Sequence, residues 1–300
     1  MMLDCVIVGG GPAGLNAALV LGRARRKVVL FDNNSPRNAV TNESHGFITR
    51  DGIKPSEFRK IAHYDIGKYP SVVIRNEKIF DIKKRGTIFN LVTEEGECIQ
   101  AKKVILATGL KEIHPSVEKL MDYYGKSLFS CPYCDGWELK DRPLIVLSEH
   151  PAVFHMVKIV YNWSKNLIIC TNGHKVLTLE QKEVLQRKGI KIIEQKIRTL
   201  VGENGLLEAV IFEDDQIEKM SGGFVTPEWI QASFFGKSLG CEVNQLGGLI
   251  TDELGRTNID GIYAAGDTSV IAPSQVIIAA AQGSRAAIGV NSDLTQEEFN

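Results

Sequence analysis

Residues 9–14 read Gly-Gly-Gly-Pro-Ala-Gly and lie between an apolar run, Leu3–Val8, and an alanine- and leucine-rich segment that extends to about residue 25. This order predicts a buried strand, a glycine turn and a helix, with Pro12 at a first helical position, where its missing N–H costs no hydrogen bond. A second apolar run, Val28–Phe31, ends at Asp32. This order of elements is a strand, a glycine turn, a helix, a second strand and an acid. At this spacing it is typical of a dinucleotide-binding βαβ unit.

The glycines of such a turn allow the backbone to approach a pyrophosphate, whose negative charge is favoured by the N-terminus of the following helix. The acid at the end of the second strand is placed to bind a ribose hydroxyl. A lone glycine fingerprint is a weak signal. Here the glycines follow a predicted strand, open a predicted helix and precede a second strand that ends in an acid. We therefore interpret the segment as a nucleotide-binding site.

The rest of the chain alternates between strands and helices. Strands are predicted at residues 72–74, 78–83, 87–93 and 97–102, as a small β-meander, and at 104–109, 143–147, 167–170, 192–193 and 261–267. Helices are predicted at residues 55–68, 151–163, 178–188 and 274–291, and antiparallel strands within 197–220. We therefore predict an α/β fold of two Rossmann-like, three-layer ββα dinucleotide-binding domains, the second inserted in the first.

The composition is that of an ordinary globular protein. The 300 residues are 44% hydrophobic and 24% charged, and the net charge is −1. Because this charge is close to zero, no strong field for nucleic acid or an anionic membrane is expected. No apolar run reaches the ~18 residues of a membrane span and nothing resembles a signal peptide, so a cytoplasmic protein is expected.

Two of the six cysteines are closely spaced, in the stretch Cys131-Pro132-Tyr133-Cys134. Cysteines three positions apart share a helix face and can form a disulfide, and a helix N-terminus lowers a thiol pKa. The alternative is half of a zinc site. A second ligand pair at suitable spacing is missing, so no metal is expected. The other four cysteines are expected to be small core residues: Cys5, Cys98, Cys170 and Cys241.

Together these motifs resemble the low-molecular-weight thioredoxin reductase family. The matching stretches cover nearly the whole chain in the family's order: residues 9–14, 107–109, 131–136, 265–267 and Gln275. The resemblance implies a homodimeric FAD enzyme. Residues 1–112 and 243–300 would form the FAD domain, and residues 113–242 a second dinucleotide domain with the redox dithiol. The implied partner is a thioredoxin-like protein or a small dithiol.

The resemblance also implies roles for the dithiol residues. Cys134 would face the flavin, Cys131 would exchange with the substrate, and Asp135 would shuttle protons. Asp32 would hold the adenosine ribose, and Asp267 would lie toward the ribityl and phosphate region. The residues implied in FAD binding are Gly9, Gly11, Pro12, Ala13, Gly14, Asp32, Asn38, His45, Thr108, Gly109, Gly266, Asp267, Gln275 and Val276.

One region departs from the family pattern. The strand at 143–147 is followed by Ser-Glu-His-Pro-Ala at 148–152, where NADPH recognition needs glycines, and Glu149 would repel a pyrophosphate. The next strand ends in Cys-Thr-Asn-Gly-His at 170–174, which offers no arginine pair for a 2′-phosphate. We therefore predict that standard NADPH recognition is lost. The alternative is a divergent loop that still binds the nicotinamide nucleotide.

This departure is similar to the flavin dithiol oxidases of the gliotoxin and holomycin type, which pass electrons from a dithiol to oxygen. Residues 22–26, 36–39 and 45–47 also look similar to that subgroup. Many of its members have His directly after the second cysteine, where this chain has Asp135. Three alternatives to a thioredoxin-reductase-like enzyme stay open: an oxygen-using dithiol oxidase, a reductase supplied by a ferredoxin-type donor, and a redox-sensing flavoprotein without turnover.

Overall fold

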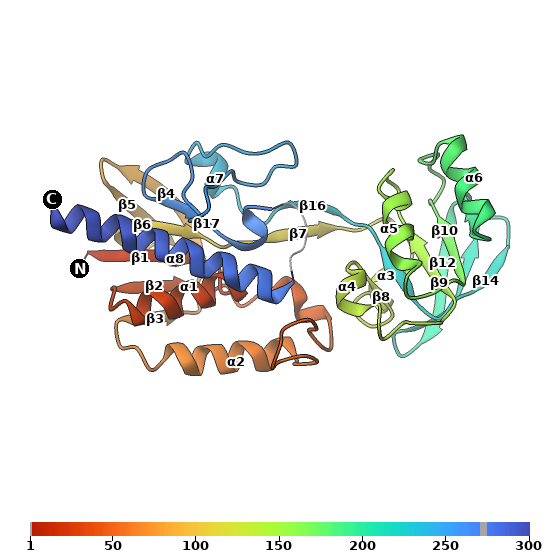
Figure 1. Ribbon diagram of the computed structural model, residues 1–300, viewed down its shortest axis with the longest axis horizontal. Coiled ribbons are helices and arrows are strands. Elements are labelled where there is room, and N and C mark those ends of the chain that lie inside the picture. Colours follow the sequence, from red (N-terminus) through yellow and green to blue (C-terminus); the bar gives the residue numbers. More distant parts are fainter. Residues whose placement is uncertain (1, 271–274) are drawn as a thin grey trace. The chain divides into compact units, whose positions relative to one another are not determined.

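The computed structural model describes residues 2–270 and 275–300, which divide into two compact units. The first unit takes its residues from Met1–Ala39, Glu43–Lys111 and Trp229–Asn300, and the second from Val40–Asn42 and Glu112–Glu228. Each unit has its own sheet and its own buried core. The second unit is thus an insertion in the first, and the predicted two-domain α/β fold is confirmed (Figure 1).

The sheet of the first unit has seven strands, in the order β3-β2-β1-β6-β5-β4, with β17 also paired to β6. These strands are β1 (Leu3–Val8), β2 (Val28–Phe31), β3 (Val72–Arg75), β4 (Ile79–Arg85), β5 (Ile88–Thr93), β6 (Cys98–Leu106) and β17 (Ile262–Ala264). The central strands are parallel and covered on both faces, which explains why β1 and β2 are nearly continuous apolar runs.

The predicted β-meander is wrong in two respects. β3 is not part of it, because the crossover through α2 (Pro55–Ile66) returns the chain parallel to β2. The two strands predicted at 97–102 and 104–109 are one strand, β6. One edge of β6 pairs antiparallel with β5 over Cys98 to Ala101 and then parallel with β17 over Val104 to Leu106. The single strand β6 therefore pairs with both the antiparallel meander and the parallel part of the sheet.

Helices α1 (Pro12–Arg23) and α8 (Val276–Phe299) pack side by side on one face of this sheet (Figure 1). Their backbones approach so closely that a Cβ on Gly283 would overlap the carbonyl oxygen of Ala13. The amide of Asn16 donates to the carbonyl of Ala280 at 2.9 Å. Helix α8 begins at Val276; the predicted first residue, Ser274, lies outside the described residues.

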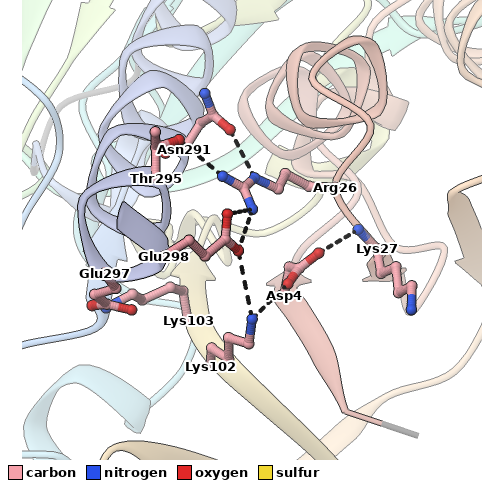
Figure 2. Close-up of polar contacts among 9 residues, drawn as sticks. All are labelled: Asp4, Arg26, Lys27, Lys102, Lys103, Asn291, Thr295, Glu297 and Glu298. Atoms are coloured by element: carbon pink, nitrogen blue, oxygen red, sulfur yellow. Dashed lines mark hydrogen bonds and ion pairs between the residues drawn. The ribbon is translucent and has the colours of Figure 1, made fainter. Parts of the chain in front are cut away.

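Figure 2 shows how the end of α8 is tied to the start of the sheet. The Arg26 guanidinium donates to Asn291 at 2.8 Å and to Glu298 at 2.7 Å. Lys103 is buried in β6 and pairs with the exposed Glu297 of α8, so its buried charge has a partner. These contacts orient the long helix whose other end faces the candidate site.

The second unit contains a five-stranded parallel sheet and a three-stranded antiparallel sheet, in the orders β11-β10-β9-β15-β8 and β12-β13-β14. Its strands are β8 (Leu128–Phe129), β9 (Leu144–Leu147), β10 (Leu167–Cys170), β11 (Lys191–Ile193), β12 (Ile197–Glu203), β13 (Leu206–Phe212), β14 (Ile217–Lys219) and β15 (Gly223–Val225). Its helices are α3 (Leu120–Tyr123), α4 (Pro132–Asp135), α5 (Val153–Val160) and α6 (Leu179–Arg187). This is the predicted second βαβ arrangement.

The chain crosses between the units in β7 (Leu110–Ile113) and again in the strand that pairs with it, β16 (Glu228–Gln231). The second crossing comes at Trp229, earlier than the expected residue 243, because the segment after β16 packs on the first unit. There α7 (Phe235–Ser238) lies beside Cys241, which is buried in the first unit's core. Within residues 2–270 and 275–300, no helix has both the length and the apolar character that a bilayer crossing requires.

Candidate functional site

The glycine turn after β1 is shaped to admit a ligand close to its backbone. Gly9 has φ +115°, and a Cβ there would overlap the carbonyl oxygen of Ala107. A Cβ on Gly14 would overlap the carbonyl of Gly9. A Cβ on Gly11, the N-cap of α1, would meet nothing within 4 Å. The turn is therefore closed on its protein side and open above Gly11, as a pyrophosphate cradle requires.

Two predicted turns from distant parts of the chain converge on this cradle. Gly266 opens the short helix η2 (Gly266–Thr268), and its Cβ position lies 2.9 Å from the Cβ of Ala13 in the first turn of α1. The amide of Gly109 donates to the Thr268 hydroxyl at 2.8 Å. The segments after β1, β6 and β17 thus meet at one edge of the sheet, where parallel α/β folds bind ligands.

Thr108 has a partner that the sequence did not indicate. Its hydroxyl is 2.9 Å from the hydroxyl of Ser233, which follows β16. The backbone of Ala232 donates to the carbonyl of Gly109 at 3.0 Å. These bonds fix the turn after β6 against the returning chain.

Asp32 is buried at the end of β2, where the nucleotide fingerprint places it. A Cβ on Gly10 would overlap its carboxylate, so the turn leaves room for this side chain. One carboxylate oxygen accepts from the amide of Asn34 at 2.9 Å, and the other pairs with Arg59 of α2. Sequence reasoning missed Arg59, because no local motif connects α2 with the end of β2.

The remaining predicted cofactor residues lie around the N-terminus of α8 and the loop before α2. Gln275 is the N-cap of α8, which begins at Val276, and its side-chain nitrogen lies 2.7 Å from the Cβ position of Gly46. His45, next to Gly46, has its ring nitrogens 3.5 Å from the carboxylates of Glu43 and Asp51. The structure therefore brings His45 and Gln275 into one neighbourhood.

Asn38 and Asp267 are joined to the site through the short helix η1 (Arg37–Val40). The guanidinium of Arg37, beside Asn38, lies 3.2 Å from the Asp267 carboxylate. The same guanidinium stacks over the ring of Trp229, 5.2 Å from its centroid. Arg37 is a second residue that sequence reasoning did not assign.

Cys131 and Cys134 are joined by a disulfide in the second unit. Cys131 is the N-cap of α4, and the amides of Cys134 and Asp135 both donate to its carbonyl at 3.1 Å. Tyr133 and Trp137 on either side of Cys134 are each 67% exposed, so the dithiol lies on an aromatic surface of this unit.

Asp135 follows the disulfide and is mostly buried. Burial, together with the negative charge of Glu138, raises the pKa of its carboxyl to about 7. An acid with this pKa exists in both forms at neutral pH and can donate or accept a proton beside the cysteines.

The remaining cysteines are free thiols. Cys5, Cys170 and Cys241 are buried as expected, and burial raises the pKa of each thiol. The prediction for Cys98 is wrong: it is exposed at the start of β6, where the strand alternates between core and solvent.

Side chains in the region expected to have lost NADPH recognition are hydrogen-bonded to one another and to the backbone. The Glu149 carboxylate, after β9, accepts from the amide nitrogen of Asn172, after β10, at 2.6 Å. The other end of the Asn172 amide accepts from the backbone of Ile197 at 3.0 Å. The buried Ser148 hydroxyl bonds to the backbone of His150. Side chains thus connect the ends of β9 and β10, where a dinucleotide would cross a βαβ unit.

Comparison with known proteins places this geometry in a family. A model of the pyridine nucleotide-disulphide oxidoreductases matches residues 3–283. The chain belongs to this family. The name of the family describes electron transfer between a nucleotide cofactor and a disulfide. The glycine cradle in one unit and the Cys131–Cys134 disulfide in the other agree with that description. Membership implies a flavin cofactor of the FAD type, and the open cradle above Gly11 fits its pyrophosphate.

Two of the three similar proteins described next carry the name thioredoxin reductase. A crystal structure from Bacillus anthracis, solved under the provisional name thioredoxin reductase TrxB, is 50% identical, has a TM-score of 0.96 and covers 99% of this chain and 100% of that one. The structure of HlmI is 32% identical, with a TM-score of 0.94, over 99% and 94% of the two chains. Thioredoxin reductase sirT of Leptosphaeria maculans is 30% identical over 97% of this chain and 94% of its own. The predicted thioredoxin-reductase-like oxidoreductase is confirmed.

Proposed function

We propose that this flavoprotein passes electrons between FAD and a thioredoxin-like protein or small dithiol through Cys131 and Cys134, without standard NADPH recognition. The observation that supports the last part is the hydrogen bond between Glu149 and Asn172 at the ends of β9 and β10. The enzyme class itself follows from family membership and from the disulfide.

In this proposal the first unit holds FAD. Gly9, Gly11 and Gly14 surround the pyrophosphate, Asp32 binds the adenosine ribose, and Asp267 lies toward the ribityl chain. Asn38, His45, Thr108, Gly109 and the start of α8 at Gln275 and Val276 complete the site, with Pro12, Ala13 and Gly266 shaping its floor. Bound FAD supplies a two-electron redox centre. Orienting it is the task of this unit's backbone turns.

The exchange itself takes place at the two cysteines. A substrate thiolate attacks the sulfur of Cys131, and the Cys131–Cys134 bond breaks to leave Cys134 as a thiolate. The second substrate thiol then attacks the mixed disulfide, so the substrate leaves oxidised and the enzyme holds a dithiol. Asp135 accepts and returns protons during these steps because its pKa of about 7 allows both. The reverse sequence reduces a disulfide substrate.

The hydrogen bonds of Glu149 and Asn172 in the second unit argue against a nicotinamide nucleotide as electron partner. A pyrophosphate over the turn after β9 would meet the carboxylate of Glu149, and two negative groups in contact repel each other. It would also have to break the bonds that Glu149 and Asn172 make. With NADPH disfavoured, a dithiol donor with oxygen as acceptor, or a ferredoxin-type donor, becomes the expected partner.

Anaerobic bleaching of the flavin tests this proposal. Purified protein is mixed separately with NADPH, with dithiothreitol and with a reduced ferredoxin, and the flavin absorbance is followed. We expect dithiothreitol to bleach the flavin and NADPH to leave it oxidised over a turnover time. Reoxidation on admitting air would identify oxygen as the acceptor, and bleaching by ferredoxin would identify the donor of a reductase.

Two variants make the result specific. Cys134→Ser should bind FAD but lose bleaching by dithiothreitol, since the intramolecular disulfide is gone. Glu149→Gln should leave bleaching by dithiothreitol unchanged. Rapid bleaching of the parent protein by NADPH would contradict the assignment of residues 148–174.

A further inference from the structure

The redox disulfide lies in a very short helix. Helix α4 has four residues, Pro132–Asp135, with Cys131 as its N-cap. Its first backbone bonds run from the amides of Cys134 and Asp135 to the carbonyl of Cys131. Isolated helices shorter than about 12 residues are marginal in water, so a single helical turn takes its stability from the residues that pack against it. We call residues 131–136 the redox turn.

Trp163, which follows α5, packs directly against the redox turn. A Cβ on Gly136 would lie 2.7 Å from Cδ2 and 2.8 Å from Cε2 of the indole. Side chains do not come this close, so the indole can lie here only because position 136 is a glycine. The indole also meets the ring of Tyr133 edge-on, with 5.7 Å between centroids and 87° between planes, an arrangement that aromatic pairs favour. Trp163 therefore contacts the redox turn both between its cysteines and at its end.

Hydrogen bonds fix the segment that carries this indole. The carbonyl of Trp163 accepts from the amide of Asp141 at 2.9 Å. The hydroxyl of Ser164, a buried residue, donates to the carbonyl of Arg142 at 2.6 Å. Both bonds join the end of α5 to the chain just beyond the redox turn. The indole is therefore held in place from its own backbone as well as through its ring.

A fixed turn matters most when the disulfide is open. A substrate dithiol reduces Cys131–Cys134 by two thiol–disulfide exchanges, in which two electrons and two protons pass to the cysteines and the substrate becomes a disulfide. In the oxidised protein the S–S bond itself keeps the cysteines together, whereas in the reduced protein only the turn does so. A turn that keeps the thiols close raises their effective concentration toward each other, which favours the disulfide at equilibrium.

We infer that Trp163 is a positioning residue for the redox pair. Its contacts with Gly136 and Tyr133 keep the two thiols close after reduction, and so stabilise the disulfide relative to the dithiol. This inference rests on the proposed function, in which the two cysteines exchange electrons with a substrate. It adds that the end of α5, which no motif of the redox turn indicates, sets how readily the disulfide is reduced.

Redox titration of the holoprotein tests the inference. Samples are equilibrated anaerobically in mixtures of reduced and oxidised dithiothreitol and trapped with an alkylating reagent, and the protein mass gives the fraction with Cys131 and Cys134 as thiols. Trp163→Ala should raise the equilibrium constant for reduction about three- to tenfold, the range that one aromatic pair contributes. Trp163→Phe should restore most of the parent value, because a ring can still meet Tyr133. An unchanged equilibrium constant in Trp163→Ala would overturn the inference.

Phe154→Ala is the matched control for a loss of stability. Phe154 lies in α5 and packs against a core cluster of the second unit. Its removal should lower the unfolding temperature and leave the equilibrium constant for reduction unchanged. A shift as large as that of Trp163→Ala would show that this constant follows the stability of the whole unit, and would overturn the positioning role.

A double-mutant cycle tests the contact between the two rings. Tyr133→Leu should also raise the equilibrium constant for reduction, because it removes the other ring of the pair. Combined with Trp163→Ala, it should raise the constant by less than the product of the two single effects, since both variants remove the same contact. A double variant that equals this product would show that the rings act independently, and would overturn the contact as the cause.

The flavin absorbance of the same samples separates this inference from the proposed function. A parent protein whose cysteines become reduced while its flavin stays oxidised would overturn the proposed passage of electrons between the cysteines and FAD. The alkylation measures the cysteines alone, so it decides the role of Trp163 in either case.

Discussion

In the proposed exchange, the charge state of Asp135 decides how protons move at the dithiol. A carboxyl in water titrates near pH 4, but burial and the neighbouring Glu138 raise the pKa of Asp135 to about 7. The group is therefore balanced between acid and base at the pH of most cells. The exchange that we propose at Cys131 and Cys134 uses such a group, because thiolate attack and thiolate release occur in the same cycle.

Asp135→Asn should slow anaerobic flavin reduction by dithiothreitol about a hundredfold at pH 7, because the amide neither accepts nor donates this proton. Stopped-flow flavin absorbance between pH 5 and 9 measures the rate of this reduction. The parent protein should show an inflection near pH 7 that the variant lacks. Glu138→Gln is the matched variant: removal of its negative charge should move the inflection to lower pH. An unchanged inflection in Asp135→Asn would show that another group titrates.

Asp135 also makes folding pH-dependent. Its pKa is higher in the folded chain than in the unfolded chain, so the folded state binds the proton more tightly. The stability that this proton provides is fully present below the unfolded pKa of about 4. It is lost as the pH rises through about 7. Urea unfolding measures the free energy of unfolding at pH 5 and at pH 8. From pH 5 to pH 8 this free energy should fall more for the parent protein than for Asp135→Asn. Equal losses in the two proteins would contradict this assignment.

At the scale of elements, the close packing of α1 with α8 and the open turn before α1 use glycine for different purposes. Gly283 of α8 lies against the carbonyl of Ala13, and only a glycine permits that distance between the helices. Gly11 faces open space above the cradle. A methyl group on Gly283 would therefore disturb the packing of the two helices. A methyl group on Gly11 would occupy the space of the proposed ligand.

Gly283→Ala should therefore lower the free energy of unfolding of the apoprotein by about 1–3 kcal/mol, because the methyl group has no room. Gly11→Ala should lower it by less than about 1 kcal/mol, the effect of a poorer N-cap. Its FAD affinity should nevertheless fall strongly, since the methyl group blocks the approach to the backbone. Urea unfolding and FAD titration of both variants measure the contrast. Equal effects of the two variants on unfolding would contradict it.

The whole molecule consists of two units that share no buried core cluster among the described residues. Two clusters belong to the first unit and two to the second. The chain crosses between them at either end of the short segment Val40–Asn42, in β7 and in β16. Because each unit buries its own apolar surface, each has the means to fold and unfold by itself.

Scanning calorimetry should consequently resolve two unfolding transitions. Added FAD should raise the midpoint of one, since a ligand stabilises the unit that binds it, and leave the other nearly unchanged. Reduction of the Cys131–Cys134 disulfide should instead affect the second transition, because both cysteines lie in the second unit. A single transition that FAD raises as a whole would show that the units unfold together.

Much of this protein could be predicted from the sequence because the signals are local. A glycine turn needs neighbouring glycines, a βαβ unit needs a fixed spacing of apolar runs, and the Cys131–Cys134 disulfide closes within one turn of chain. The same reasoning failed where local signals were ambiguous. β3 looks like a meander strand until α2 places it parallel to β2, and Cys98 looks like a core residue until the alternation of β6 exposes it.

The sequence by itself determined the α/β class, the insertion of one nucleotide-type unit in another, and the redox dithiol. Only the tertiary structure decided which charges meet. Arg37 reaches Asp267 across 230 positions of the chain, Arg59 reaches Asp32 across 27, and Asn172 reaches Glu149 across 23. The physical reason is that side-chain patterns repeat every 2 residues in strands and about every 3.6 in helices, whereas ion pairs depend on which strand ends the folded sheets bring together.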